Sequence, residues 1–278
     1  MGEHKKKDSF KILDSHSDIF ERIKEESPAW WKLFCEDDEL YIDIRKENYI
    51  SIYYYGGSLA KIEYKNSFTA SIHEKYMGID GKDYADLDLR TLNKNKIKKI
   101  KERIKINYLD KGNPEKPAEK KIQGEMILRN SNYIDSEFQY NQDVEIGKLR
   151  IDLIELSNGK LSFVELKGIT DSRLRNDEKR NSKIPEIIEQ IEKYQSFINK
   201  YELEIIDYYK RLIQLKNDLG LSKHSIDFTL NKTPKLLIVD TYKKTTKGRE
   251  ERINDIKKML ETHSIKCEFV KRDDNHDS

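Results

Sequence analysis

The chain has 278 residues, which is enough for one large domain or two modest ones. Its 53 lysines and arginines nearly balance 51 aspartates and glutamates, and the formal net charge of +2 excludes a histone-like blanket of positive charge while leaving local nucleic-acid-binding patches open. No apolar run approaches a membrane span, there is no signal-peptide pattern, and two distant cysteines favour neither a disulfide framework nor a cysteine metal site. The composition therefore predicts a soluble protein of the reducing cytoplasm with no membrane partner.

Residues 40–76 carry the pattern of strands, because apolar residues alternate with polar ones and β-branched and aromatic side chains are frequent. Gly56-Gly57 separates two of these runs and predicts a hairpin turn. We expect a small antiparallel sheet with no catalytic constellation. Residues 89–106 predict a basic helix, whose lysines either form a solvated face or contact phosphates.

A cluster of helix- and strand-breaking residues follows at positions 111–114 and at Pro117. We interpret this cluster as a domain boundary. The prediction is an N-terminal β-rich domain over residues 1–112, with a recognition or regulatory role inferred from its position alone, and a second domain over residues 113–278.

The second domain is predicted to open with a helix over residues 118–129. Glu119 lies in its first turn, where a carboxylate suits the helix dipole. A strand over residues 138–146 and then a β-hairpin over residues 149–167 are expected next. The hairpin has Asn158-Gly159 at its centre, and this dipeptide between apolar-alternating runs is a strong hairpin signal.

Three charged residues lie on the strands of this hairpin. Pairing the strands across the turn puts Asp152 opposite the neighbourhood of Glu165, and Lys167 shares a face with Glu165 because side chains alternate along a strand. Charges on a half-buried strand are costly unless they are paired or bind a metal. The alternative is a plain salt bridge from Lys167 to Asp152 or Glu165 on a solvated face.

A polar, basic loop over residues 171–183 leaves the end of the second hairpin strand, either as a phosphate-contacting segment or as a solvated connection. A helix is then predicted over residues 185–219, opened by Pro185 and closed by Gly220. Its apolar residues recur in alternating steps of four and three, which is a heptad stripe. The stripe either packs within the chain or joins another copy in a homo-oligomer, and its aromatic content slightly favours packing within the chain or an antiparallel contact.

The chain ends with a buried-type strand at residues 235–240, a helix at 249–263 and a strand at 265–270. The order of elements in this domain predicts an α/β fold with a mixed sheet. With the antiparallel sheet before it, the whole chain is α+β.

The order of charged residues resembles that of the PD-(D/E)XK nuclease superfamily, in which a helix acid, a strand Asp and a Glu-x-Lys precede another helix. The matching residues are Glu119, Asp152, Glu165, Leu166 and Lys167. Gln190 and Tyr194, four apart on one helix face, resemble the Gln-x-x-x-Tyr motif of RecB-like nucleases. The stretches AEKKIQGEMILRN, FVELKG and IIEQIEKYQSFI are also similar to the nuclease domain of Shedu-type antiphage proteins.

The resemblance implies a restriction-endonuclease-like fold and phosphodiester hydrolysis. Asp152, Glu165 and the Leu166 carbonyl would hold Mg²⁺ or Mn²⁺, which prefer hard oxygen ligands. Lys167 would orient the attacking water or offset developing charge. Glu119 would ligate through water or orient a ligand, with Glu125 as the backup candidate.

In the same resemblance, Gln190 and Tyr194 would position the phosphate or Lys167, although Tyr194 also belongs to the heptad stripe and fits a plain core role. The leading hypothesis is a metal-dependent deoxyribonuclease, expected to act as an endonuclease in defence against foreign DNA. The alternative is a non-catalytic nucleic-acid-binding or assembly protein that keeps the fold. The sequence leaves open the choice of DNA or RNA, the target, and any activating partner protein.

Overall fold

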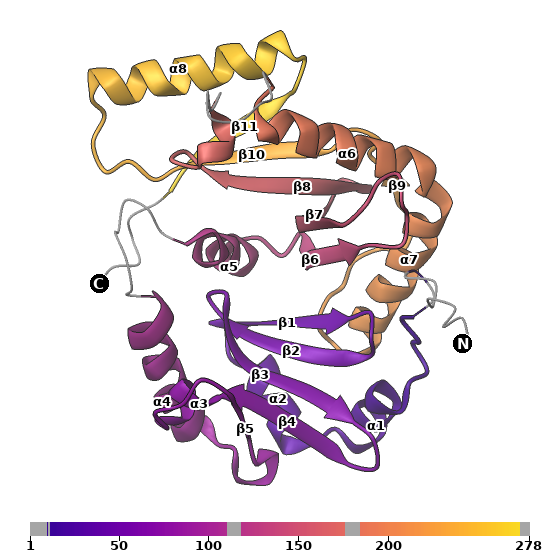
Figure 1. Ribbon diagram of the computed structural model, residues 1–278. Coiled ribbons are helices and arrows are strands. Elements are labelled where there is room, and N and C mark those ends of the chain that lie inside the picture. The colour runs from indigo at the N-terminus through magenta and orange to yellow at the C-terminus, as the bar shows by residue number, and fades with distance from the viewer. Residues whose placement is uncertain (1–9, 11, 110–117, 176–183, 273–278) are drawn as a thin grey trace, which may run out of the picture. The chain divides into compact units, whose positions relative to one another are not determined.

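The computed structural model describes residues 10, 12–109, 118–175 and 184–272. They form a mixed α and β structure with one antiparallel and one mixed sheet, which confirms the coarse fold class (Figure 1). No helix among these residues is long and apolar enough to cross a membrane. The predicted breaker cluster at residues 111–114 and 117 lies outside the described residues.

The chain groups into two compact units, each made of several segments. The first unit takes the described residues of Met1–Lys111, Lys120–Asp135 and Leu203–Thr229, and the second those of Gly112–Glu119, Ser136–Glu202 and Leu230–Ser278. The division differs from a single boundary at residue 112, because two later segments also belong to the first unit.

The first unit contains an antiparallel sheet in the order β1-β2-β3-β4-β5 (Figure 1). Its elements are α1 (Asp18–Glu26), α2 (Ala29–Cys35), β1 (Leu40–Arg45), β2 (Tyr49–Tyr54), β3 (Gly57–Tyr64), β4 (Phe68–His73), α3 (Glu74–Met77), β5 (Tyr84–Asp86), the 3₁₀ turn η1 (Leu89–Thr91), α4 (Lys94–Ile104) and the π-helical turn η2 (Lys105–Leu109). The hairpin turn is Tyr55-Gly56, because Tyr54 pairs with Gly57 and both central residues have positive φ, as this turn requires.

The basic helix begins five residues later than the sequence pattern predicts. Asn93 caps α4 by accepting the N–H of Lys96 through its side chain, and Leu89–Thr91 forms a separate 3₁₀ turn. A capping asparagine satisfies a free N–H at a helix start, so it fixes the boundary that apolar spacing alone leaves open.

The first unit is completed by α5 (Glu119–Arg129) and α7 (Glu202–Asp218), each from its second residue on. A buried polar network connects α7 to β1. Arg45 lies 3.1 Å from Asp43 Oδ2. Lys216 Nζ donates to the Ile134 carbonyl at 2.5 Å and lies 3.5 Å from Asp43 Oδ1. The Tyr209 hydroxyl donates to Asp135. Burial of these charges is tolerated because each has a partner.

The second unit contains a mixed sheet in the order β11-β10-β8-β7-β6, with β9 also paired to β8 (Figure 1). Its strands are β6 (Tyr133–Tyr140), β7 (Leu149–Ser157), β8 (Lys160–Gly168), β9 (Thr229–Leu230), β10 (Lys235–Asp240) and β11 (Cys267–Lys271). The sheet is mixed because β7 and β8 are antiparallel, whereas β10 runs parallel to both β8 and β11.

The strand predicted at residues 138–146 lies instead at Tyr133–Tyr140. Its start was missed because the polar residues there do not read as a strand. Its end is set by Asp143, whose carboxylate accepts the N–H groups of Glu145 and Ile146 and thereby folds residues 143–147 into a turn.

Helices α6 (Glu186–Lys200) and α8 (Lys247–Thr262) cover one face of this sheet, beside the 3₁₀ turn η3 (Ser172–Leu174). Leu236 and Ile238, which share a face of β10, pack with Ile187 and Ile191 of α6 and with Ile256 of α8. This cluster is the core that holds α6 above β8.

The single helix predicted over residues 185–219 is wrong, because α6 ends at Lys200 and α7 begins at Glu202. Tyr201 leaves helical geometry, with φ −120° and ψ 27°. Its ring packs 5.1 Å from that of Tyr140, and its hydroxyl donates to Asp143 at 2.6 Å. These two contacts of Tyr201 coincide with the break between the helices. The heptad spacing that predicted one helix continues across it, because only one residue is non-helical.

The heptad stripe itself is buried inside the chain. Its buried members are Ile187, Ile191, Tyr194, Ile198, Ile205, Tyr208, Leu212, Leu215 and Leu219. Packing within the chain is therefore the alternative that the structure favours, and a homo-oligomer formed through this helix stays a prediction.

Candidate active site

The site is built on the β7–β8 hairpin. Asn158 and Gly159 both have positive φ and form the predicted two-residue turn. Leu153 pairs with Val164, so the next position along the ladder sets Asp152 opposite Glu165, as the sequence predicts. The Leu166 N–H donates to Asp152 Oδ2 at 3.0 Å and fixes that carboxylate across the strands.

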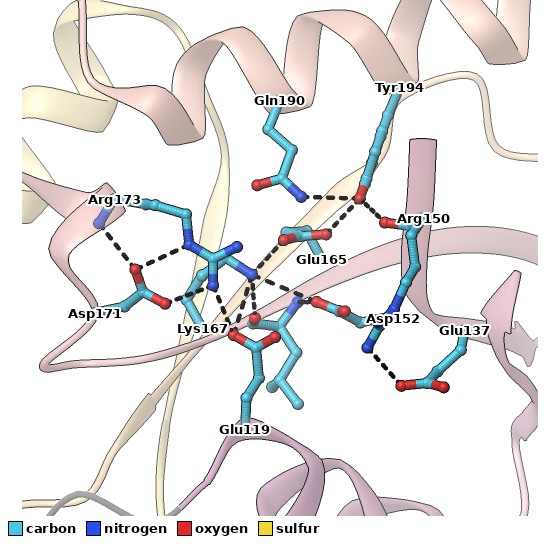
Figure 2. A network of polar contacts seen from close by, with 11 residues as sticks. Glu119, Glu137, Arg150, Asp152, Glu165, Lys167, Asp171, Arg173, Gln190 and Tyr194 are labelled. Atoms are coloured by element: carbon cyan, nitrogen blue, oxygen red, sulfur yellow. Dashed lines mark hydrogen bonds and ion pairs between the residues drawn. The ribbon is translucent and has the colours of Figure 1, made fainter. Parts of the chain in front are cut away.

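Lys167 lies at the centre of the cluster (Figure 2). Its Nζ donates to the Leu166 carbonyl at 2.7 Å and to Glu119 at 3.3 Å, lies 3.5 Å from Asp152 Oδ2, and forms an ion pair with Glu165. Lys167 and Glu165 are both 0% exposed. The solvated-face alternative is therefore wrong, because the ion pairs exist but they lie in the interior.

Burial and mutual repulsion shape the protonation of the cluster. Burial and the charge of Asp152 raise the pKa of Glu165 to about 8, against the opposing effect of Lys167. Burial also acts to lower the pKa of Lys167, but Glu165, Asp152 and Glu119 outweigh it and raise that pKa above its usual value. Lys167 is consequently an ammonium ion at neutral pH and is no general base.

The predicted Gln-x-x-x-Tyr pair of α6 reaches the same cluster (Figure 2). The Tyr194 hydroxyl donates to Glu165 Oε2 at 2.7 Å, contacts the Arg150 carbonyl oxygen, and accepts a hydrogen bond from Gln190 Nε2 at 2.9 Å. Tyr194 thus holds one oxygen of Glu165. Burial and Glu165 together raise the pKa of Tyr194, so the phenol keeps its proton.

Glu119, the first residue of α5, also points into the cluster. Burial raises its pKa, against the opposing effect of Lys167. Its Oε2 accepts a hydrogen bond from Arg173 Nη2 at 2.9 Å as well as from Lys167. Glu125, the backup candidate, does not line the cleft that contains the other residues.

Two residues of the site were not singled out from the sequence. Arg173 and Asp171 form a two-point ion pair beside Glu119, directly after β8 (Figure 2). The sequence identified only a polar, basic loop over residues 171–183, part of which lies outside the described residues. The available signal was the Asp-x-Arg spacing, because an Asp can accept the backbone N–H two residues later.

Apart from Leu166, Lys167 and Asp171, these residues line an open cleft of about 490 Å³. Its lining residues are Glu119, Lys148, Leu149, Arg150, Asp152, Glu165, Arg173, Glu186, Glu189, Gln190, Lys193 and Tyr194. All but one of them are polar or charged, which suits a charged substrate better than an apolar one.

The donor set fits a divalent cation in its chemistry. Asp152, Glu165 and the Leu166 carbonyl offer hard oxygens, and the buried Oε1 of Glu165 has no hydrogen bond beyond its ion pair with Lys167. With every group ionised, the carboxylates of Glu119, Asp152, Glu165 and Asp171 against Lys167 and Arg173 leave a formal charge of −2. A divalent cation would neutralise that excess.

The carboxylates of the cluster are not arranged in the geometry of a metal site. Among the described residues, no three His, Cys, Asp or Glu side chains are arranged so that they could hold a metal ion, and the Lys167 ammonium lies among the carboxylates.

The chain was compared with models of protein families, with curated proteins and with solved structures, and it matches none of them.

Proposed function

We propose that the protein is a divalent-metal-dependent DNA nuclease that hydrolyses phosphodiester bonds. One observation carries the proposal: Asp152, Glu165, Glu119 and Tyr194 line one polar cleft, and the buried Lys167 contacts the three carboxylates among them. Buried ionisable groups with perturbed pKa values in a cleft are more often functional than ordinary surface charges. Endonuclease action in defence against foreign DNA extends this proposal through the family resemblance.

Each residue has a role that follows from its contacts. Asp152, Glu165 and the Leu166 carbonyl would hold Mg²⁺ or Mn²⁺, which lowers the pKa of water and stabilises charge on the phosphate when bound. Tyr194 keeps one Glu165 oxygen in place, and Gln190 keeps Tyr194 in place. Lys167, an ammonium ion, offsets the negative charge that builds up on the reacting phosphate.

The test is cleavage of supercoiled and linear DNA with Mg²⁺, Mn²⁺ or EDTA. We expect metal-dependent cleavage that falls at least about 100-fold in Asp152→Asn and in Lys167→Ala, the order seen when a charge-stabilising group is removed. Cleavage of the supercoiled circle identifies an endonuclease. Lys160→Ala is the matched control, because Lys160 lies exposed on the same strand as Lys167.

Thermal unfolding of each variant separates loss of chemistry from loss of folding. Full activity in both folded variants would reject the nuclease. DNA binding without cleavage under any divalent ion would favour the alternative, a nucleic-acid-binding or assembly protein that keeps the fold.

A further inference from the structure

We propose that Arg173 is a phosphate-binding residue of this cleft, one that contacts the nucleic-acid backbone beside the reacting group. The inference rests on the proposed nuclease function and adds a substrate contact to it. Arg173 lines the cleft together with Asp152 and Glu165. Guanidinium groups present several N–H donors in one plane and are well suited to phosphate oxygens.

Arg173 is held in position before any substrate binds. Asp171 Oδ1 accepts the backbone N–H of Arg173 at 2.8 Å and its Nε at 3.0 Å, while Asp171 Oδ2 accepts Nη2 at 2.7 Å. One carboxylate therefore fixes both the turn η3 and the plane of the guanidinium. This ion pair also raises the pKa of Arg173, so the positive charge is permanent.

The backbone that carries this pair is itself anchored. The Asp171 N–H donates to the Gly168 carbonyl at 2.9 Å, and the Ile169 N–H donates to Val239 of β10 at 2.9 Å. From α8, Arg252 donates to the Ile169 carbonyl at 2.7 Å and to that of Asp171 at 3.3 Å. Because hydrogen bonds hold both the side chain of Arg173 and the backbone before it, its guanidinium loses little conformational entropy when it binds a ligand.

Lys167 is not available to bind the neighbouring backbone phosphate, although it lies nearest the carboxylates. Its side chain is 0% exposed, and its ammonium is already engaged by Glu119, Glu165 and the Leu166 carbonyl. The Arg173 side chain is 30% exposed, and within the described part of the chain its side-chain hydrogen bonds involve Nε and Nη2 alone. Arg173 can therefore meet a phosphate from the solvent side without breaking its contact to Asp171.

The first unit contains a second copy of this arrangement. Asp88 Oδ1 accepts the backbone N–H of Arg90 and its Nε, both at 3.0 Å, at the start of the 3₁₀ turn η1. Arg90 is 91% exposed and does not line the cleft. It has the same local bonding without the catalytic surroundings, which makes Arg90→Ala a matched control.

The first experiment measures duplex DNA binding in EDTA over a range of salt concentrations. A residue that neutralises one phosphate adds about 0.9 to the slope of log affinity against log salt. We expect Arg173→Ala to lower that slope by about 0.9, Arg173→Lys to keep it, and Arg90→Ala to leave it unchanged. A purely structural role for Arg173 would not move this slope.

The second experiment measures cleavage with Mg²⁺ as a function of DNA concentration. We expect Arg173→Ala to raise the half-saturating DNA concentration about tenfold, whereas Arg90→Ala leaves it unchanged. If wild type cleaves and Arg173→Ala matches Arg90→Ala in both experiments, the phosphate contact is wrong and the nuclease stands. If wild type binds without cleaving and only Arg173→Ala lowers the slope, the nuclease is wrong and the contact stands. If wild type neither binds nor cleaves DNA, both the nuclease and the phosphate contact are wrong.

Discussion

At the scale of residues, the ion-paired interior around Lys167 is costly. Taking a charge out of water costs several kcal/mol, and well-packed apolar residues in place of a buried ion pair are often neutral or stabilising. Lys167 and Glu165 are nevertheless fully buried, and Glu165 lines an open polar cleft. Stability alone gives no reason for such a cluster, whereas the proposed chemistry on a charged substrate would.

Removal of the Tyr194 hydroxyl tests how far the cluster depends on its hydrogen bond to Glu165. Tyr194→Phe removes the hydrogen bond to Glu165 Oε2, and an intramolecular hydrogen bond contributes about 0.5–1.5 kcal/mol to stability. The pKa of Glu165, already about 8, should rise further, because this bond acts to lower it. We expect a lower melting temperature, measured by circular dichroism, together with weaker metal-dependent cleavage.

Tyr201→Phe is the control for that variant. The Tyr201 hydroxyl also donates to a carboxylate, that of Asp143 at 2.6 Å, but it does not line the cleft. Tyr201→Phe should lower the melting temperature and leave cleavage by the folded protein unchanged. Equal losses of cleavage in the two variants would contradict a specific role for Tyr194.

At the scale of elements, the turn after β6 depends on one ionised carboxylate. Hydrogen bonds from Lys200, Tyr201 and the backbone hold the pKa of Asp143 well below its ordinary 3.8. A depressed pKa stabilises the fold above the ordinary value, and that stability is lost as the pH falls through the folded pKa. Asp143→Asn should therefore melt below wild type at pH 7, and the difference should narrow as the pH falls past about 3.8. A difference that is constant with pH would contradict this assignment.

Helix α5 packs against the β2–β3 turn through a glycine. A Cβ on Gly124 would lie 2.4 Å from the backbone nitrogen of Gly56 and from the Tyr55 carbonyl carbon. Gly124→Ala should destabilise the protein by about 1–3 kcal/mol, measured by urea unfolding, since the obstacle is backbone and cannot rotate away. In α8, a Cβ added at Gly248 would meet no described atom within 4 Å. Gly248→Ala should therefore leave the stability of the protein unchanged or raise it.

The elements differ in how much the sequence shows of them. Asn158-Gly159 is a local signal, and it was sufficient to predict the turn and the pairing of Asp152 with Glu165. The break at Tyr201 depends on contacts with Tyr140 and Asp143, which are distant in sequence. Apolar periodicity reports which face is buried, and it does not register one non-helical residue.

The site shows the same limit. Spacing within the hairpin predicted that its charged residues meet, and spacing along α6 predicted that Gln190 and Tyr194 share a helix face, because both are short-range geometry. That Glu119, Gln190 and Tyr194 join the hairpin residues was expected from the family resemblance. Arg173 was missed because its importance comes from Glu119, 54 positions away, and not from its own neighbours in sequence. Two domains were predicted, but the grouping of segments 120–135 and 203–229 with the first unit was not, since neither segment carries a local sequence signal of the sheet that it belongs with.

At the scale of the whole molecule, the first unit needs segments from beyond residue 112. A fragment of residues 1–112 would lack Asp135 and Lys216, which accompany Arg45 and Asp43 in the buried network. Removing partners from buried charges costs about 3–5 kcal/mol. We expect this fragment to show no cooperative thermal transition by circular dichroism. A sharp transition near that of the intact chain would contradict the assignment of the later segments to this unit.

The interleaving of the two units also bears on how such a protein can be rearranged in evolution. Among the described residues, the chain passes between the units inside α5, inside β6, at the start of α7 and inside β9. A single recombination junction at any of these points would split a unit and give neither half a complete set of segments. Exchange of one unit for another would require several simultaneous junctions, so the two are expected to be inherited and diversified together.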